Sequence, residues 1–432
     1  MKNKRVLIIT YYWPPSGGSG VQRTLYFAKY LKHFGWEPII YTVENGEFPA
    51  IDESLLKEIP EGTEVIKTKI WEPYGLYKKF TGKKKAQKLK PLIVTEKQDR
   101  QLAHQVSTWI RGNFFIPDAR KFWIKPSIQY LTTYLKEHPV DLLFSSSPPQ
   151  SVHLIALGVK KALNIPWVAD FRDPWTKISY YDDLMLMNWA DKKHKQLELE
   201  VLQTADTVIT VSESCQKDFV TIGNREVQVV TNGFEDSIVL PSIVPDPSYF
   251  TISYTGTLSR DRNPISIWKG IQELVQENAA LKKALRLRFI GNVDRSIFES
   301  LEELGLQENY EKIGHVPHSK VFDYLMSSNA LLLIGIPNDK GVLTGKLFEY
   351  LFSSKPILSI GPKDGDIDAI LEESQAGTCV DFEEKDAFKT ALLAYFNKRH
   401  IPSSKEVSPL VGAYSRRNLT KKLADYFDQL VG

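Results

Sequence analysis

Short apolar runs alternate along the chain with longer stretches whose apolar residues recur at the spacing of an amphipathic helix. In the first half these runs predict strands at Val6–Tyr12, Pro38–Thr42, Glu64–Thr68, Val140–Ser145, Pro166–Phe171, Thr207–Val211 and Val227–Thr231. The second half restarts the pattern and predicts strands at Phe250–Thr255, Leu285–Ile290, Ala330–Ile334, Pro356–Ile360 and Thr378–Val380. Strands that alternate with helices are typical of parallel sheets covered by helices, so the pattern predicts an α/β fold.

A proline-rich stretch, Leu240–Ser248, separates the two series of strands. Proline removes backbone donors and stiffens the chain, which is typical of a linker. We therefore predict two doubly wound Rossmann-like parallel-sheet domains, residues 1–236 and 248–406, that face a cleft. Ligands in such folds bind outside the carboxyl ends of the strands. The amphipathic segment in residues 414–432 predicts a helix that packs back on the first domain.

Composition and charge exclude several classes of protein. With 42% hydrophobic and 25% charged residues among 432, the chain has ordinary globular usage, which excludes a disordered chain. The formal charge of +3 is too small to indicate nucleic-acid binding. Cys215 and Cys379 lie too far apart to suggest a zinc site or a disulfide framework. We expect no nucleic-acid partner and no structural metal.

The N-terminus lacks the features of a signal peptide, because its apolar stretch, Val6–Ile9, is too short for one. No stretch approaches the roughly 20 apolar residues that a membrane-spanning helix needs. We therefore expect a cytoplasmic protein, peripheral at most to the inner face of a membrane.

The first predicted strand leads into a glycine-rich loop, Ser16–Gly20, that precedes a predicted helix. Gly17 and Gly18 let the backbone approach a ligand, and the helix N-terminus favours an anion there. Arg23 stands where a dinucleotide-binding fingerprint has its third glycine, so a dinucleotide site is not indicated. A turn that serves only the fold remains the alternative.

Charged side chains gather at the end of the predicted strand Pro166–Phe171. Asp170, Arg172 and Asp173 lie together there, and such charges are costly to bury unpaired. We expect these three residues to serve catalysis, with His153 after the preceding strand as a further candidate. The alternatives are a structural Asp–Arg pair that holds the loop and an ordinary helical histidine.

In the second half, the strand Phe250–Thr255 runs into a glycine turn that carries arginines. Gly256 and Thr257 form the turn, and Arg260 and Arg262 follow it. Guanidinium groups are always charged and bind phosphate oxygens in pairs, so this loop is a candidate diphosphate site. A solvated charged loop is the alternative.

The stretch Gly341–Leu351 is the most informative in the sequence. Thr344 is a plausible N-cap, and the helix that follows directs free amides and a positive dipole toward an anion. Lys346 adds a charge in the first turn, and Glu349 lies on the same helical face. We expect Gly341, Leu343, Thr344, Lys346 and Glu349 to contact a nucleotide sugar. The alternative is a surface salt bridge.

Taken as a set, these motifs resemble those of glycosyltransferase family 4. The resemblance covers nearly the whole chain and depends on motif order: the glycine-rich first loop, Asp170–Trp175, Val211–Glu213, Asn232–Phe234, Tyr254–Thr257 and Lys346–Tyr350. It implies the GT-B fold, a nucleotide-sugar donor and retention of the anomeric configuration.

The resemblance also implies roles for single residues. The family motif has two glutamates with seven residues between them, and Glu349 matches the second, which is implied to bind the donor ribose. Gly341 stands in place of the first glutamate, which in the family lies near the transferred sugar. For the arginine and lysine that grip the diphosphate, Arg262 and Lys346 are our candidates, with Arg260 in reserve.

We therefore predict a hexosyltransferase that moves a sugar from a UDP- or GDP-linked donor to a glycan or polyprenyl-linked acceptor in cell-surface polysaccharide biosynthesis. Lysine and arginine would stabilise the leaving diphosphate, so we expect neither a metal nor a cofactor. Two alternatives remain open: a nucleotide-sugar 2-epimerase of the same fold and a non-catalytic two-domain sugar-binding protein.

Basic and aromatic residues in the first half predict contact with a membrane. Lys78–Lys90 contains seven lysines and no acid. Apolar residues interleaved with arginines and lysines follow at Trp109, Ile110, Phe114, Phe115, Ile116, Phe122 and Trp123. Such a combination suits an anionic membrane surface. The alternatives are a solvated loop for the lysines and ordinary core positions for the aromatic residues.

Overall fold

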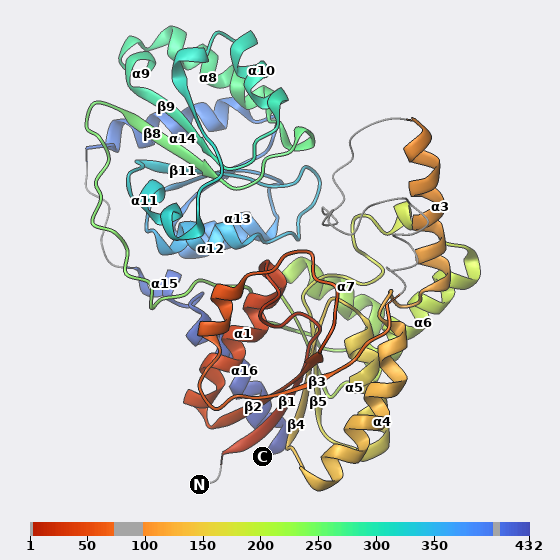
Figure 1. Cartoon of the computed structure of the whole chain (residues 1–432). Coiled ribbons are helices and arrows are strands. Elements are labelled where there is room, and N and C mark those ends of the chain that lie inside the picture. Colours follow the sequence, from red (N-terminus) through yellow and green to blue (C-terminus); the bar gives the residue numbers. More distant parts are fainter. Residues whose placement is uncertain (1–2, 73–97, 401–406) are drawn as a thin grey trace. The chain divides into compact units, whose positions relative to one another are not determined.

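The computed structural model describes residues 3–72, 98–400 and 407–432 and divides the chain into two compact units (Figure 1). The first unit comprises Met1–Thr231 and Leu419–Gly432, and the second comprises Asn232–Asn418. The chain passes from the first unit to the second after Thr231, five residues before the expected boundary at 236. Phe234 stacks on Phe352 of the second unit with ring centroids 4.9 Å apart, so the residues just after the crossing pack with that unit.

The first unit is a parallel sheet of seven strands among the described residues, in the order β3-β2-β1-β4-β5-β6-β7. Its strands are β1 (Lys4–Ile9), β2 (Trp36–Val43), β3 (Glu64–Thr68), β4 (Leu142–Ser147), β5 (Trp167–Phe171), β6 (Thr207–Thr210) and β7 (Gln228–Val229). Its helices are α1 (Ser19–Leu31), α3 (Gln98–Phe114), α4 (Lys121–Glu137), α5 (Ser151–Leu163), α6 (Asn188–Thr204), α7 (Glu213–Gly223) and α16 (Arg416–Val431), with short 3-10 turns η1 (Lys32–Phe34), η2 (Glu53–Glu58) and η3 (Asp182–Leu184).

Both faces of this sheet are covered because successive side chains of a strand point to opposite faces. In β1, Val6 and Ile8 belong to the apolar cluster that contains α1 and α16. Leu7 and Ile9 belong instead to the cluster that contains α4, α5, α6 and α7. A strand buried on both faces must be apolar throughout, which explains the continuous apolar runs in the sequence.

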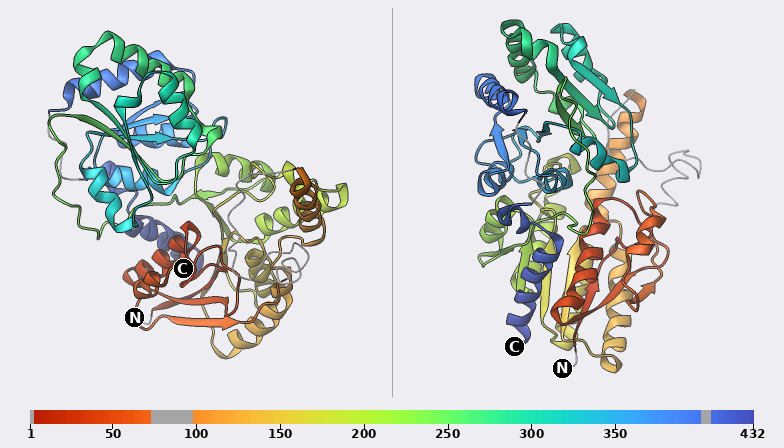
Figure 2. Two further views of the ribbon diagram at one scale, coloured as in Figure 1. Left: turned by 45° about the horizontal axis from the view of Figure 1, so that its top comes forward. Right: turned by 90° about the vertical axis from the view of Figure 1, so that its left-hand side faces the viewer.

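The C-terminal helix α16 packs on the first unit. Leu423 and Phe427 are fully buried in one apolar cluster with β1 side chains, and Lys4 Nζ donates to Asp428 Oδ1 at 3.2 Å. The C-terminal end of the chain is therefore held beside its first strand, and the right-hand view of Figure 2 shows the N and C labels close together.

Trp123 lies in the core of the first unit and not on a membrane-facing surface. Its ring stacks on Tyr41 with centroids 5.3 Å apart, and its Nε1 donates to Thr68 Oγ1 at 2.9 Å. It is 1% exposed, because α4 turns this position toward the sheet. For this aromatic residue the core alternative is correct.

The second unit is a parallel sheet of six strands among its described residues, in the order β10-β9-β8-β11-β12-β13. Its strands are β8 (Phe250–Thr255), β9 (Leu285–Ile290), β10 (Tyr310–Ile313), β11 (Ala330–Ile334), β12 (Ile357–Ile360) and β13 (Gly377–Val380). Its helices are α8 (Ile265–Glu277), α9 (Ala279–Ala284), α10 (Arg295–Glu303), α11 (Val321–Met326), α12 (Gly345–Phe352), α13 (Asp366–Ser374), α14 (Lys385–Lys398) and α15 (Pro409–Gly412), with 3-10 turns η4 (Arg260–Arg262), η5 (Gln307–Asn309) and η6 (His318–Lys320).

The predicted α/β class with two doubly wound parallel sheets is confirmed. One strand, β10, was missed in the sequence. It lies at the edge of its sheet, and its segment Tyr310–Ile313 is mostly partly exposed, with Glu311 and Lys312 in its middle, so it lacks the apolar run of strands such as β8 and β11. No helix of the described residues is long and apolar enough to cross a membrane.

Candidate functional site

The strand order of each sheet reverses direction at one point. Chain order runs outward from β1 through β2 to β3 on one side, and from β4 onward on the other, so the reversal lies between β1 and β4. In the second unit it lies between β8 and β11. Open α/β sheets bind ligands at the carboxyl ends of the strands beside such a switch point. We therefore expect the functional side chains at the carboxyl ends of the strands beside these two switch points.

In the second unit, Lys346 lies at the switch point. The helix α12 follows β11, and the Lys346 Nζ reaches Tyr254 at the end of β8, where it donates to the Tyr254 hydroxyl at 2.6 Å. The ammonium also lies 4.2 Å from the centroid of the Tyr254 ring. Tyr254 is fully buried and its hydroxyl donates to the Thr257 carbonyl at 2.6 Å, so the lysine is held by a rigid partner.

Two further polar groups at this switch point are buried without a hydrogen-bond partner among the described residues. They are Nε of Arg262, on η4 after β8, and Oγ1 of Thr344, at the start of α12. Thr344 has the extended backbone of an N-cap as expected, but its side chain makes no capping bond. Buried polar atoms are almost always paired in native proteins, so a ligand with acceptor oxygens would suit both groups.

The charges at this site are predominantly positive. Burial and the nearby guanidinium of Arg262 lower the pKa of Lys346 from its ordinary 10.5 to about 7, while the Glu349 carboxylate acts in the opposite direction. Two cations that share one carboxylate repel each other unless an anion joins them. The arrangement is therefore suited to a diphosphate.

Gly256 allows the lysine to lie against the backbone. Its φ of +99° is rare for residues with a side chain, and an added Cβ would lie 3.3 Å from Lys346 Cδ. Gly291, after β9, has φ +120°, and a Cβ there would lie only 2.4 Å from the Gly256 carbonyl oxygen. These two glycines let the β8 and β9 ends pass closely beside the lysine.

Glu349, the expected ribose-binding residue, is partly exposed on α12, and its Oε1 lies 2.9 Å from Nε2 of His318. Gly341 donates its amide to Asp339 Oδ1 at 3.1 Å. Leu343 is 9% exposed and packs in the apolar cluster that contains α12.

The remaining candidates of this loop, Thr257 and Arg260, are both exposed. Arg260 lies close enough to Asp294 to lower the pKa of that carboxyl slightly, after the larger effect of hydrogen bonds from Ser296. Arg262, in contrast, lowers the pKa of Lys346. The choice of Arg262 before Arg260 stays a prediction.

In the first unit, Asp170 is fully buried in an ion pair. Its Oδ1 accepts from Arg23 Nη2 at 2.8 Å and its Oδ2 accepts from Arg23 Nε at 3.0 Å, with Ser146 Oγ donating at 2.6 Å. Arg23 also donates to the Thr231 carbonyl at 2.9 Å. The structural Asp–Arg pair considered as an alternative is present, but its arginine comes from α1 and not from the neighbouring Arg172.

Arg172 is 9% exposed and joins three backbone carbonyls. It donates to Ser147 O at 2.6 Å, to Pro148 O at 3.0 Å and to Gly20 O. It therefore fastens the end of β4 to the first turn of α1, across the switch point, and the protein itself occupies its guanidinium.

The other two catalytic candidates differ in accessibility. His153 is fully buried on α5, with Nδ1 2.8 Å from Ser145 Oγ. Burial lowers the pKa of His153 to about 3, so the ring is neutral near pH 7. Its Nε2 has no partner among the described residues. Asp173 is exposed beyond the tip of β5, where a ligand can reach it.

The two candidate glycines of the glycine-rich loop differ in their surroundings. The Gly17 amide donates to the Ala50 carbonyl at 2.9 Å. Gly18, at the N-cap of α1, is exposed with φ +93°, and nothing lies within 4 Å of a Cβ placed there. Of these two glycines, Gly18 has the open surroundings that a ligand needs.

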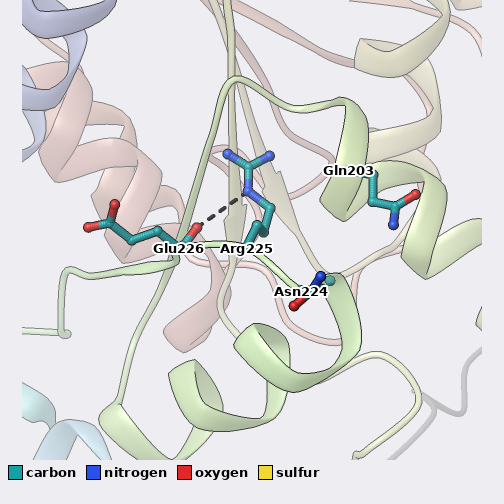
Figure 3. A pocket seen from close by; sticks show the side chains of 5 residues that line it. Gln203, Asn224, Arg225 and Glu226 are labelled. Atoms are coloured by element: carbon teal, nitrogen blue, oxygen red, sulfur yellow. Dashed lines mark hydrogen bonds between the residues drawn. The ribbon is translucent and has the colours of Figure 1, made fainter.

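A surface hollow of about 360 Å³ lies elsewhere in the first unit (Figure 3). It is lined by Gln203, Gly223, Asn224, Arg225 and Glu226. Its guanidinium, from Arg225, donates to the carbonyls of Leu202, Ala205, Asp206 and Glu226. The hollow precedes β6 and β7 in the chain and therefore lies at the amino ends of these strands, away from the candidate site residues.

Sequence reasoning missed three residues that hold the site. In the sequence, Arg23 is considered only because it stands where a dinucleotide-binding fingerprint has its third glycine. The available signal for its role was an arginine early in the predicted helix. Tyr254 belongs to the motif Tyr254–Thr257, but the sequence assigns it no function. His318 gave no signal, because its partner Glu349 lies 31 positions away.

Among the described residues, no group of three or more histidine, cysteine, aspartate or glutamate side chains could hold a metal ion. Metal-independent transfer remains a prediction.

Comparison with known proteins finds similarity to glycosyltransferases. The model of glycosyltransferase family 4 matches residues 85–237. The fold is similar to a glycosyltransferase from Rickettsia africae ESF-5, with 13% identity, coverage of 100% of this chain and 99% of that chain, and a TM-score of 0.62. A comparison with curated proteins finds no match.

Two other solved structures are similar over nearly their whole length. HepE from Anabaena, in complex with UDP-glucose, has 12% identity, coverage of 99% of this chain and 100% of that chain, and a TM-score of 0.57. The lipopolysaccharide outer core galactosyltransferase WaaB, in its apo form, has 13% identity, the same coverage and a TM-score of 0.57.

The chain thus has the GT-B fold, built from two Rossmann-like domains. The match of the family model bears out the resemblance to glycosyltransferase family 4 over residues 85–237.

Proposed function

We propose that the chain is a hexosyltransferase that moves a sugar from a nucleotide-diphosphate donor to a glycan or polyprenyl-linked acceptor, with retention and without a metal. One observation carries the proposal. Lys346 and Arg262 lie together at the β8/β11 switch point, with the Arg262 Nε and the Thr344 hydroxyl buried and unpaired there. A diphosphate supplies the negative charge and the acceptor oxygens that these three groups need.

The chemistry that follows is stabilisation of a leaving group. As the sugar–oxygen bond breaks, negative charge develops on the departing nucleoside diphosphate, and cations already in place stabilise it without reorganisation. Tyr254 holds the Lys346 ammonium in position through the 2.6 Å bond to its hydroxyl. Glu349 would accept from the ribose hydroxyls, and His318 fixes one of its oxygens.

The finer assignments have indirect support. The UDP-glucose bound to HepE favours a UDP-linked donor, with a GDP-linked one as the other option. The outer core galactosyltransferase activity in the name of WaaB favours a cell-surface glycan as acceptor. We propose that the protein works at the inner face of the membrane. The lysines of Lys78–Lys90 lie outside the described residues and remain a predicted contact.

The test is to incubate the protein with a panel of UDP- and GDP-sugars, with and without lipid-linked acceptors, and to measure diphosphate release. A transferase releases diphosphate faster with its acceptor, an epimerase converts the donor without any acceptor, and a binding protein turns over neither. Lys346→Ala should lower kcat/KM at least about 30-fold, which corresponds to more than about 2 kcal/mol of transition-state stabilisation.

A matched control is Lys283→Ala, which removes an exposed lysine at the amino end of β9 in the same unit. This variant should keep the wild-type rate. Equal rates for wild type and Lys346→Ala would remove the proposed diphosphate grip.

A further inference from the structure

Six aromatic side chains lie in two clusters of three on the first unit, and we call them together the aromatic ridge: Trp71, Trp109, Phe114, Phe115, Phe122 and Trp189. In the first cluster the ring centroids lie 4.7 Å apart for Trp71–Phe122 and 6.2 Å apart for Phe115–Phe122. In the second they lie 5.6 Å apart for Trp109–Phe114 and 5.9 Å apart for Phe114–Trp189. The two clusters adjoin in the chain at Phe114 and Phe115. Four of the six are exposed by 40% to 55%. Large aromatic side chains left in water as a group are unusual on a monomer and mark an interaction site.

The helix α3 (orange in Figure 1) extends the ridge with an apolar stripe. Val106, Ile110 and Phe114 recur every four residues and are exposed by 54%, 41% and 51%, so they form one solvent-facing line. Among residues 105–114 of α3, whose side chains the structure describes, the buried ones are Thr108, Gly112 and Asn113, all small or polar. Over these residues the apolar face of the helix is therefore its outer face, the reverse of an ordinary surface helix.

Asn113 fastens a loop beside this stripe. Its side chain donates to the Met185 carbonyl at 3.3 Å and accepts from the Met187 amide at 2.7 Å. A Cβ on Gly112 would lie 2.8 Å from Leu186, so the helix and the loop are in close contact. Met185 and Met187 are nevertheless exposed by 41% and 45%. The fold thus keeps these flexible apolar side chains at the surface beside the ridge.

Positive charge lies along the ridge. Lys121 lies 5.3 Å from the Phe115 centroid and 5.2 Å from that of Phe122. Arg111 and Lys125 are exposed on α3 and α4, each within one helical turn of a ridge ring. The acid between positions 105 and 125 is Asp118, which accepts from the Ser151 amide and hydroxyl at 2.8 Å.

We propose that the aromatic ridge inserts into the headgroup region of an anionic membrane. Tryptophan and phenylalanine suit the boundary between headgroups and acyl chains, and arginine and lysine beside them suit anionic lipid. The cores of protein–protein interfaces are depleted of lysine, whereas here a lysine lies over two of the rings. The charge complementarity therefore favours a lipid surface over a protein partner.

The proposal extends the proposed function, because a polyprenyl-linked acceptor lies in a membrane. Membrane binding itself requires no sugar transfer. A vesicle assay without donor or acceptor therefore fails or succeeds independently of the transferase assay.

The experiment is co-sedimentation of the full chain with vesicles of phosphatidylcholine, with and without phosphatidylglycerol. The ridge variant is Trp71→Ser with Phe114→Ser, and its control, Ile51→Ser with Leu56→Ser, removes two comparably exposed apolar side chains elsewhere on the same unit. The ridge variant should partition at least about tenfold less than wild type, given the transfer energy of two such rings. The control should stay within about twofold, and circular dichroism should show all three folded.

A charge variant tests the lipid type. Arg111→Gln with Lys125→Gln should reduce binding to anionic vesicles by about fivefold for each charge and leave binding to neutral vesicles unchanged. Salt should weaken anionic binding in wild type more than in this variant.

Three outcomes overturn the proposal. The first is no binding of wild type to anionic vesicles at low salt. The second is equal loss in the ridge and control variants, which would place the contact elsewhere on the chain. The third is a concentration-dependent dimer that the ridge variant abolishes while vesicle binding is unchanged, since a second copy would then cover the ridge.

Discussion

Lys346 makes donor affinity depend on pH in a predictable direction. Burial and Arg262 lower the pKa of Lys346 from 10.5 to about 7, so near neutrality only about half of the free protein carries the ammonium. The diphosphate binds the protonated form. Affinity should therefore be highest below pH 7 and fall as the pH rises through the pKa.

The magnitude follows from the protonated fraction. With a pKa of about 7, that fraction is about nine-tenths at pH 6 and about one-tenth at pH 8, so the donor Kd should rise about tenfold between them. At pH 7, binding should take up about half a proton. Calorimetric titration with the nucleotide sugar selected from the panel, in two buffers of different ionisation enthalpy, measures both quantities.

A second ionisable side chain beside this site is His318, whose Nε2 lies 2.9 Å from Glu349 Oε1. The variant Lys346→Arg separates the contributions of Lys346 and His318 to the pH dependence, because the guanidinium stays charged while His318 is retained. In this variant the donor Kd should be nearly constant from pH 6 to pH 8. A wild-type Kd that is flat over this range, with no proton uptake, refutes the assignment of Lys346 to the diphosphate.

Two further predictions concern the frame of the site. Arg23→Ala leaves the fully buried Asp170 carboxylate unpaired and should lower the free energy of unfolding by about 3–5 kcal/mol in urea titration. The double variant Arg23→Met with Asp170→Leu should recover much of this loss. If the free energy of unfolding of Arg23→Ala stays within about 1 kcal/mol of wild type, the ion pair does not stabilise the fold as proposed. Gly256→Ala should weaken donor binding at least about tenfold, because it adds strain at φ +99° and crowds Lys346. Gly305→Ala, with φ +71° and open space around the added methyl, carries the backbone strain alone, so calorimetry should find its donor Kd unchanged.

The sequence predicts the strands well where burial makes them apolar on both faces. Strands β4, β5, β8 and β11 have such runs and are buried throughout. The edge strand β3 is predicted although only Ile66 is buried in it, because Val65 and Ile66 still form an apolar pair. The missed strand β10 is also an edge strand, but it carries the adjacent charges Glu311 and Lys312 in its middle, so no apolar pair marks it.

The site residues were harder to place than the strands, because their partners are set by strand order. Asp170 and Arg172 are close in sequence, yet Asp170 pairs with Arg23 from 147 positions away. Lys346 meets Tyr254 only because β11 lies next to β8 in the sheet. The sequence identifies which loops carry charge, but the pairing between loops depends on a topology that no local pattern encodes.

The two sheets share one strand order but use their switch points in opposite ways. In the first unit, the Asp170 carboxylate and the Arg23 guanidinium neutralise each other, and Arg172 is held by backbone carbonyls. In the second, burial and the Arg262 guanidinium lower the pKa of Lys346, and the Glu349 carboxylate acts in the opposite direction. A pair of cations that is not fully neutralised is costly to maintain. Among the described residues, such a pair lies at only one of the two switch points, which supports donor binding in the second unit. Exposed residues of the first unit, such as Asp173, are then the candidates to meet the acceptor.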